Sequence, residues 1–275
     1  MSEMPAGRPL TLCAMTLRGA TFAERVRAAA LAGFDSVGLS LDQYRRARHD
    51  GLGDAEMRGL VEEYGLRVAE VETPWDWTAA LPNDEEGELL FRVLDLFGCP
   101  QFNAVRFVPR PEEEALARFA ALCRRAAGHG VTVALEFMPF SELPALRDAW
   151  EVVSASGEPN AAVLLDSWHH HRSGDPTGLL ASIPADRIAS VQLNDALPEP
   201  EADAREEARH RRLLPGEGAI PLAGLLATLR DRGVRARMSA EIWSDALEAL
   251  PPDLAARRVF EATCHVLDEA GWPWE

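Results

Sequence analysis

A helical stretch, then a glycine, then a short apolar run recurs four times along this sequence, and this recurrence constrains the fold more than any other feature. The copies read AALAGFDSVGLSL, VEEYGLRVAEVET, RRAAGHGVTVALEF and LRDRGVRARMSAEIW. Glycine tolerates the left-handed backbone that commonly ends a helix, and the apolar run after it is typical of a buried strand. We therefore expect a helix-to-strand joint at Gly33, Gly65, Gly130 and Gly233.

Further apolar runs complete a set of eight strands. We expect them over 10–15, 36–40, 67–72, 103–108, 131–137, 161–166, 187–193 and 236–242. Helical segments such as 112–127 separate them, and connections of this length imply parallel pairing. The 275 residues fit one (β/α)8 barrel, a fold of typically about 250 residues, so residues 1–275 are expected to form a single barrel domain. An open doubly wound sheet is the alternative, although no GxGxxG follows the first strand.

The charged residues exclude several classes of function. Arginine supplies all 28 basic residues against 44 acidic ones, which gives a net charge of −16. Such a surface repels nucleic acid and anionic lipid, so we expect neither as a partner. Because lysine is absent, Schiff-base chemistry, lysine-bound pyridoxal phosphate and a Walker A loop are excluded for this chain alone.

Cysteine usage and the N-terminus predict a cytoplasmic protein. The four cysteines are scattered without a CxxC pair, which indicates core residues rather than disulfides or a zinc site: Cys13, Cys99, Cys123 and Cys264. We find no signal peptide and no apolar run of about 18 residues. The expected partner is a small-molecule substrate, and a homo-oligomer remains possible.

Four consecutive predicted strands end in a side chain with a metal-capable oxygen. Glu136 lies in VALEF, Asp166 in VLLDSWHHH, Gln192 in VQLND and Glu241 in MSAEIW. Strand ends of such a barrel face one catalytic mouth, and three carboxylates meeting there would repel one another without a cation. An all-oxygen set favours Mn²⁺, Mg²⁺ or Co²⁺, with Zn²⁺ still possible. Taken singly, each residue has a structural alternative, such as capping a helix or pairing with an arginine.

Other polar and aromatic residues near these strand ends are candidate substrate contacts. His169, three residues after Asp166, is a candidate substrate ligand or proton carrier. Arg106 and Arg212 are candidates to neutralise an anionic substrate or a developing oxyanion, with a structural role as the alternative. Around the pocket we expect a further polar contact and aromatic walls, from Glu72, Trp75, Trp77 and Trp243.

The polar insertion between the last two predicted strands has two interpretations. The segment 197–218 follows a strand end on the catalytic face, so it is a candidate lid that excludes water from the pocket. An ordinary surface loop is the alternative.

At these strand ends the chain resembles the xylose isomerase-like superfamily of sugar-phosphate isomerases and epimerases. The marks are VALEF, DSWH, VQLND, LPGEGAIPL and SAEIW, and the resemblance covers nearly the whole chain. It implies a divalent ion held by Glu136, Asp166, Gln192 and Glu241, with the two glutamates exchanging the substrate proton and with His169 and Arg212 contacting the substrate. Relatives that cut DNA carry additional histidines for a multinuclear zinc site, and these are not evident here.

The resemblance implies removal of a proton next to a carbonyl, through an enediolate that the metal stabilises. Our first expectation is an isomerase or epimerase of a sugar, a sugar phosphate or a cyclitol ketone. Gln192 stands where those enzymes commonly have histidine, and this also resembles the 3-dehydroshikimate dehydratase branch, so a lyase is the alternative. A non-catalytic barrel that only binds a ligand is the third.

Overall fold

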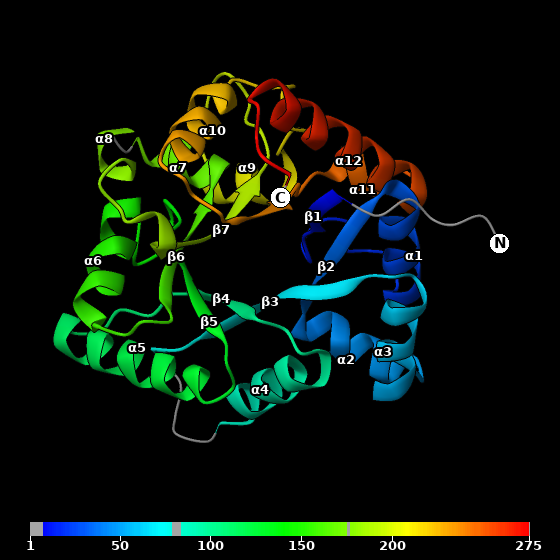
Figure 1. Cartoon of the computed structure of the whole chain (residues 1–275), viewed down its shortest axis with the longest axis horizontal. Coiled ribbons are helices and arrows are strands. Elements are labelled where there is room, and N and C mark those ends of the chain that lie inside the picture. The colour runs from blue at the N-terminus through cyan, green and yellow to red at the C-terminus, as the bar shows by residue number, and fades with distance from the viewer. Residues whose placement is uncertain (1–7, 79–83, 175–176, 275) are drawn as a thin grey trace.

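Eight parallel strands close into a barrel in the order β1 to β8, with helices around the outside (Figure 1). In this computed structural model, residues 8–78, 84–174 and 177–274 are described, apart from the side chains of residues 74, 75 and 177. The strands are β1 (Arg8–Leu12), β2 (Phe34–Ser40), β3 (Arg67–Asp76), β4 (Gln101–Val105), β5 (Thr132–Glu136), β6 (Ala161–Asp166), β7 (Ile188–Leu193) and β8 (Arg237–Ala240). The predicted (β/α)8 barrel is confirmed.

Amphipathic helices cover the barrel. They are α1 (Phe22–Ala32), α2 (Leu41–His49), α3 (Asp54–Glu63), α4 (Glu85–Phe97), α5 (Glu112–Ala127), α6 (Leu146–Ser156), α7 (Ser167–Ser173), α8 (Thr177–Leu180), the 3-10 turn η1 (Ala185–Arg187), α9 (Ala204–His210), α10 (Leu222–Asp231), α11 (Asp245–Glu248) and α12 (Pro252–Glu269). Helix α5 has the bounds that the sequence predicted, and it buries Phe119 and Cys123 against the sheet. Its first turn carries three glutamates, which the positive end of the helix dipole favours.

Strand boundaries follow from local backbone chemistry. The four predicted joint glycines all have positive φ, and Gly33 is also confined by the Phe260 ring, 2.9 Å from where a Cβ would lie. Strand β4 ends earlier than the predicted 103–108. The Asp76 carboxylate accepts hydrogen bonds from the backbone of Phe107 and, at 2.7 Å, of Val108, so these N–H groups no longer pair with a strand.

Polar side chains fill much of the barrel interior. Thr11 and Ser36 are bonded at 2.9 Å across β1 and β2, and Ser239 donates to Glu70 at 2.7 Å between β8 and β3. All four of these residues are fully buried. The apolar core therefore lies mainly between the sheet and the surrounding helices, whereas the interior of the barrel is a hydrogen-bonded column.

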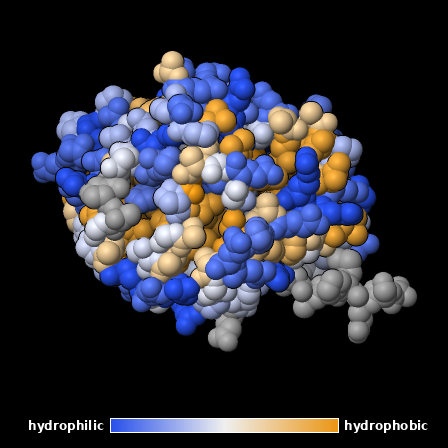
Figure 2. Space-filling view, turned by 90° about the horizontal axis from the view of Figure 1, so that it is seen from above, coloured by the Kyte–Doolittle hydropathy of each residue, from blue (hydrophilic) through white to orange (hydrophobic). Residues whose placement is uncertain are grey.

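The outer surface is mixed in character. On the face that Figure 2 shows, hydrophobic residues form scattered patches between hydrophilic ones. Among the described residues, no helix combines the length and the apolar character needed to cross a membrane.

Candidate active site

The four predicted ligands all lie at the carboxyl ends of neighbouring strands. Glu136 ends β5, Asp166 ends β6, Gln192 lies next to the end of β7, and Glu241 directly follows β8. Asp166 and Gln192 are paired residues of adjacent strands, so their side chains leave the sheet on the same side. All four side chains are buried, with Glu136 the most exposed at 6%. Parallel strands of one barrel thus bring them to a single end of the molecule.

The guanidinium of Arg212 lies among these carboxyl groups. Nη1 donates to Asp166 Oδ2 and to Glu241 Oε2, each at 2.7 Å, and Nη2 is 3.2 Å from His169 Nε2. Nε donates to the carbonyl of Ala208 at 2.9 Å, which anchors the side chain to α9. Arg212 is itself only 3% exposed. Two of the predicted metal ligands are therefore bridged by a buried arginine.

One guanidinium does not compensate the whole cluster. Burial opposes ionisation of Asp166, but the charge of Arg212 outweighs it and lowers the pKa of Asp166 to about 2. Burial raises the pKa of Glu241 to about 8, although Arg212 opposes this rise. Burial and the nearby carboxyl groups, Glu241 first, raise the pKa of Glu136 well above its ordinary value. Arg212 alone therefore supplies too little positive charge to offset the burial of Glu136 and Glu241, whose pKa values stay raised.

His169 is held as a neutral imidazole next to these groups. Its backbone N–H donates to Oδ1 of Asp166, the N-cap of α7, at 2.8 Å, which is why DxxH places the ring beside the carboxylates. Burial lowers its pKa to about 3, with Asp166 opposing and Arg212 adding to the effect. Because Arg212 can only donate, the Nε2 atom facing it is the acceptor, and the proton belongs on Nδ1. Nε2 also lies 3.5 Å from Glu136 Oε1.

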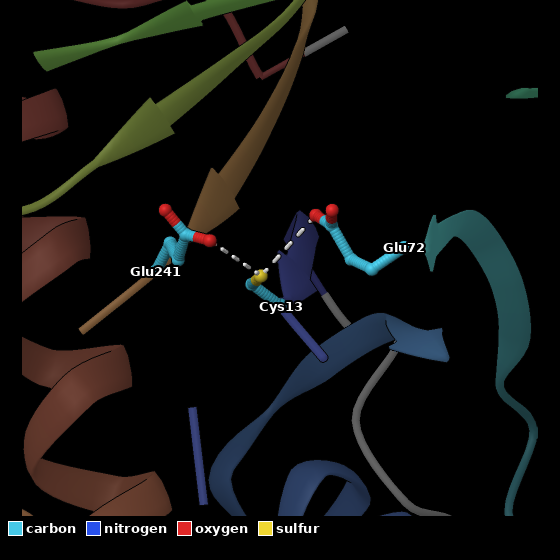
Figure 3. Close-up of side chains that lie close together, drawn as sticks. All are labelled: Cys13, Glu72 and Glu241. Carbon is cyan, nitrogen blue, oxygen red and sulfur yellow. Dashed lines mark hydrogen bonds between the residues drawn. The ribbon is translucent and has the colours of Figure 1, made fainter. Parts of the chain in front are cut away.

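Cys13 lies between the carboxyl groups of Glu72 and Glu241. Its sulfur is 3.7 Å from Glu72 Oε1 and 3.6 Å from Glu241 Oε1, as Figure 3 shows. Cys13 directly follows β1, Glu72 lies within β3, and Glu241 directly follows β8. Burial, with Glu70 and Glu241 adding to it, raises the pKa of Glu72 well above its ordinary value. The sequence interpretation treated Cys13 only as a core residue and missed this neighbourhood.

A divalent ion fits the donor set. Gln192 donates its amide N–H to Glu72 Oε1 at 2.9 Å, while its carbonyl oxygen is buried with no hydrogen-bond partner among the described residues. Leaving such an oxygen unpaired costs about 1–3 kcal/mol, which an ion would remove. Glu136, Asp166 and His169 also place ligand atoms within 4.8 Å of one another. Asp166 and Glu241, which would help to hold the ion, each also accept a hydrogen bond from Arg212.

A cavity of about 300 Å³ adjoins this cluster. Its lining includes Glu136, His169, Arg212, Glu241 and Trp243. A larger cavity of about 600 Å³ lies at the opposite end, where strands begin. Catalytic sites of (β/α)8 barrels lie where strands end, so the smaller cavity is the candidate active site.

Residues 26–265 match the family model described as xylose isomerase-like TIM barrel. The chain belongs to this family.

Two groups of curated relatives of this xylose isomerase-like barrel have different activities. It is 29% identical over 255 residues to a 3-dehydroshikimate dehydratase of Pseudomonas aeruginosa, a match that covers 88% of this chain and 39% of that protein. It is 28% identical over 146 residues to an inosose isomerase of Halalkalibacterium halodurans, covering 52% of this chain and 51% of the relative. The chain thus spans about two fifths of the first relative's length and half of the second's.

A solved structure supports the fold assignment. The IolI protein, crystallised with a bound zinc atom, superposes with a TM-score of 0.82 at 19% identity, covering 95% of this chain and 98% of that one. At this identity the likeness concerns the fold.

Arg106 does not reach the cavity of this xylose isomerase-like barrel. Its guanidinium donates to Glu112 at 3.0 and 3.2 Å and to the carbonyl of Arg110 at 3.0 Å. The earlier end of β4 places Arg106 beyond the strand, where it turns toward the start of α5. The position does not support the predicted substrate contact, so we leave Arg106 out of the site proposed below.

The tryptophans that we expected to wall the pocket lie in different places. Trp77 is buried in the core against Phe119, with ring centroids 5.3 Å apart, whereas Trp243 lines the cavity. The side chain of Trp75 lies outside the described part of the structure.

The segment 197–218 is held by hydrogen bonds, and its residues Ala208 and Arg212 line the cavity. Asp195 forms a bridge with Leu213, and its carboxylate accepts from the backbone of Gly216 at 3.0 Å and of Ile220 at 2.9 Å. At Gly218 a Cβ would lie 2.3 Å from the carbonyl oxygen of Ala196, so the chain here requires glycine. This anchoring delivers Arg212 to the carboxylates. The sequence interpretation did not identify Asp195, although it follows the strand end in VQLND.

Asn194 is the other functional neighbour that sequence reasoning missed. Its side-chain amide donates to Asp166 Oδ2 at 2.8 Å, and Ser167 Oγ donates to its oxygen at 2.8 Å. Together with Arg212 and the His169 backbone, Asn194 holds both oxygens of Asp166 in place. The available signal was an asparagine two residues after the predicted ligand Gln192, directly after the end of β7.

Proposed function

We propose that this protein is a divalent-metal-dependent enzyme that removes a proton next to the carbonyl of a small polyhydroxylated ketone, and that it is a lyase of the 3-dehydroshikimate dehydratase type. The observation that carries the proposal is a cluster of buried oxygen donors at one end of the barrel. Glu136 and Glu241 line the floor of the cavity beside the neutral ring of His169. Asp166 and the unpartnered amide oxygen of Gln192 come from the ends of the strands between them. The residues proposed to hold the ion are Glu136, Asp166, Gln192 and Glu241. Mn²⁺, Mg²⁺ and Co²⁺ suit these oxygens, and Zn²⁺ is the ion of one structural neighbour.

The bound ion would polarise the substrate carbonyl and stabilise negative charge on its oxygen, worth several kcal/mol. Glu136 is placed to take the proton from the neighbouring carbon, because its buried carboxyl group has a raised pKa and lies in the cavity. The electrons of the broken C–H bond then form the enolate. Arg212 lines the same floor and is placed to contact the substrate oxygen.

Elimination is completed when the carbon–oxygen bond of a β-hydroxyl breaks. The leaving oxygen takes a proton and departs as water, while the enolate electrons form the new double bond. His169 is the proposed proton carrier, because its neutral ring lines the cavity and its Nε2 is 3.5 Å from Glu136 Oε1. The proton removed by Glu136 can thus be passed across a short distance to the leaving group.

Two observations support our choice of dehydration over isomerisation, which was our first expectation from the sequence. The dehydratase relative matches 88% of this chain, against 52% for the inosose isomerase. By the family resemblance, Gln192 also stands where isomerases of this superfamily commonly have histidine. Isomerisation of a cyclitol ketone is the second candidate, favoured by the inosose isomerase relatives.

The test is product analysis with metal-loaded protein. Incubation with 3-dehydroshikimate and Mn²⁺ is expected to give a new aromatic ultraviolet absorbance, lost in Glu136→Gln and retained in the exposed control Glu151→Gln. Incubation with keto-inositols in D2O, followed by proton NMR, tests isomerisation through deuterium next to the carbonyl. A protein that binds Mn²⁺ but gives neither signal would contradict both functions.

A further inference from the structure

Among the described residues, the side-chain amide of Gln192 is hydrogen-bonded through its nitrogen but not through its oxygen. Nε2 donates to Glu72 Oε1 at 2.9 Å, whereas Oε1 is buried and unpartnered among the described residues. If the amide were turned around, an N–H group would take the place of Oε1, and Gln192 would offer no oxygen to a cation there. The direction of this amide therefore decides whether Gln192 can serve as a ligand.

A column of hydrogen bonds through the barrel interior determines that direction. Gln101 Nε2 donates to Ser190 Oγ at 2.9 Å and to Asn103 Oδ1 at 2.8 Å. Because the oxygen of Asn103 faces Gln101, its Nδ2 faces the other way and donates to Glu72 Oε1 at 2.6 Å. Glu72 Oε1 is thus an acceptor, and it can bond Gln192 only through the amide N–H.

We propose that Glu72 is a positioning residue for the metal site: it holds the Gln192 amide so that the carbonyl oxygen faces the ion. Asn103 supports it from below by fixing the acceptor role of Glu72 Oε1. This inference rests on the metal site of the proposed function. Partners that orient metal ligands in this way typically change metal affinity by about 10–100-fold when removed.

The experiment measures Mn²⁺ affinity by titration calorimetry, independently of turnover. Glu72→Met removes the acceptor at similar size, and we expect Mn²⁺ binding to weaken by about 10–100-fold. Glu72→Gln is the matched control, because its amide oxygen still accepts from both Asn103 and Gln192, and its affinity should change by less than about tenfold. Far-ultraviolet circular dichroism checks that both variants are folded.

A second variant separates positioning from packing. In Gln192→His one ring nitrogen can donate to Glu72 while the other faces the ion. Mn²⁺ affinity should therefore be kept in the single variant Gln192→His and lost in the double variant with Glu72→Met. If Glu72→Met does not fold, Asn103→Leu tests the same column from one step further away, with a smaller loss expected. If Glu72→Met folds and binds Mn²⁺ as tightly as the wild type, the positioning role alone is overturned. The same holds for wild-type affinity in Asn103→Leu if Glu72→Met does not fold. Absence of Mn²⁺ binding in the wild type overturns the proposed function itself, together with this inference.

Discussion

Replacing Arg212 with methionine is expected to destabilise the metal-free protein by about 3–5 kcal/mol. Its guanidinium lies 2.7 Å from both Asp166 and Glu241, and none of the three side chains is more than 6% exposed. The substitution keeps most of the apolar volume but leaves two buried carboxyl groups without their countercharge. Urea unfolding in a chelator, followed by tryptophan fluorescence, measures the loss. The control is Arg48→Met, whose side chain is 48% exposed beside Asp54 and should change stability by less than about 0.5 kcal/mol.

Adding a divalent ion makes this prediction specific to the proposed site. In the wild type the guanidinium is paired with both Asp166 and Glu241, whereas Arg212→Met removes this positive charge, which would compete with an ion for the two carboxylates. Saturating Mn²⁺, at about 1,000 times its Kd, adds about 4 kcal/mol to stability. We expect the variant to bind Mn²⁺ at least about tenfold more tightly, which corresponds to about 1.4 kcal/mol more stabilisation at equal Mn²⁺. Equal stabilisation of the two proteins would refute the reasoning that arginine and ion compete.

Three further predictions use other parts of the structure. Burial raises the pKa of Glu241 from 4.5 to about 8, so the folded protein keeps a proton here over a pH range in which the unfolded chain has lost it. Unfolding free energy in a chelator should therefore fall as pH rises from about 5 to about 9, and a flat profile would contradict this. Asp195→Ala leaves the N–H groups of Gly216 and Ile220 unpaired and should cost about 2–4 kcal/mol in urea unfolding, with a smaller loss counting against the anchoring role. Arg106→Met should lower stability but leave the substrate KM unchanged, and a raised KM would return Arg106 to the site.

Local sequence patterns determined the frame of this protein. The hydrophobic period that marks a helix or a strand, and the glycine that ends a helix, both depend on residues close together in the chain. All eight strands and the joint at Gly33 could therefore be predicted. The same locality explains why Glu136 and Asp166 could be placed together. Parallel strands of one barrel all end at the same side, so a polar residue at the end of each must face the same mouth.

What only the tertiary structure decided is which groups meet across the barrel. Arg212 enters the carboxylate cluster because bonds of Asp195 fold the segment 197–218 back, and Glu72 meets Gln192 because barrel closure brings strands far apart in sequence to one interior. Arg106, by contrast, turns outward once β4 ends. Side-chain direction and burial set these partners, and neither is encoded in the spacing of residues along the chain.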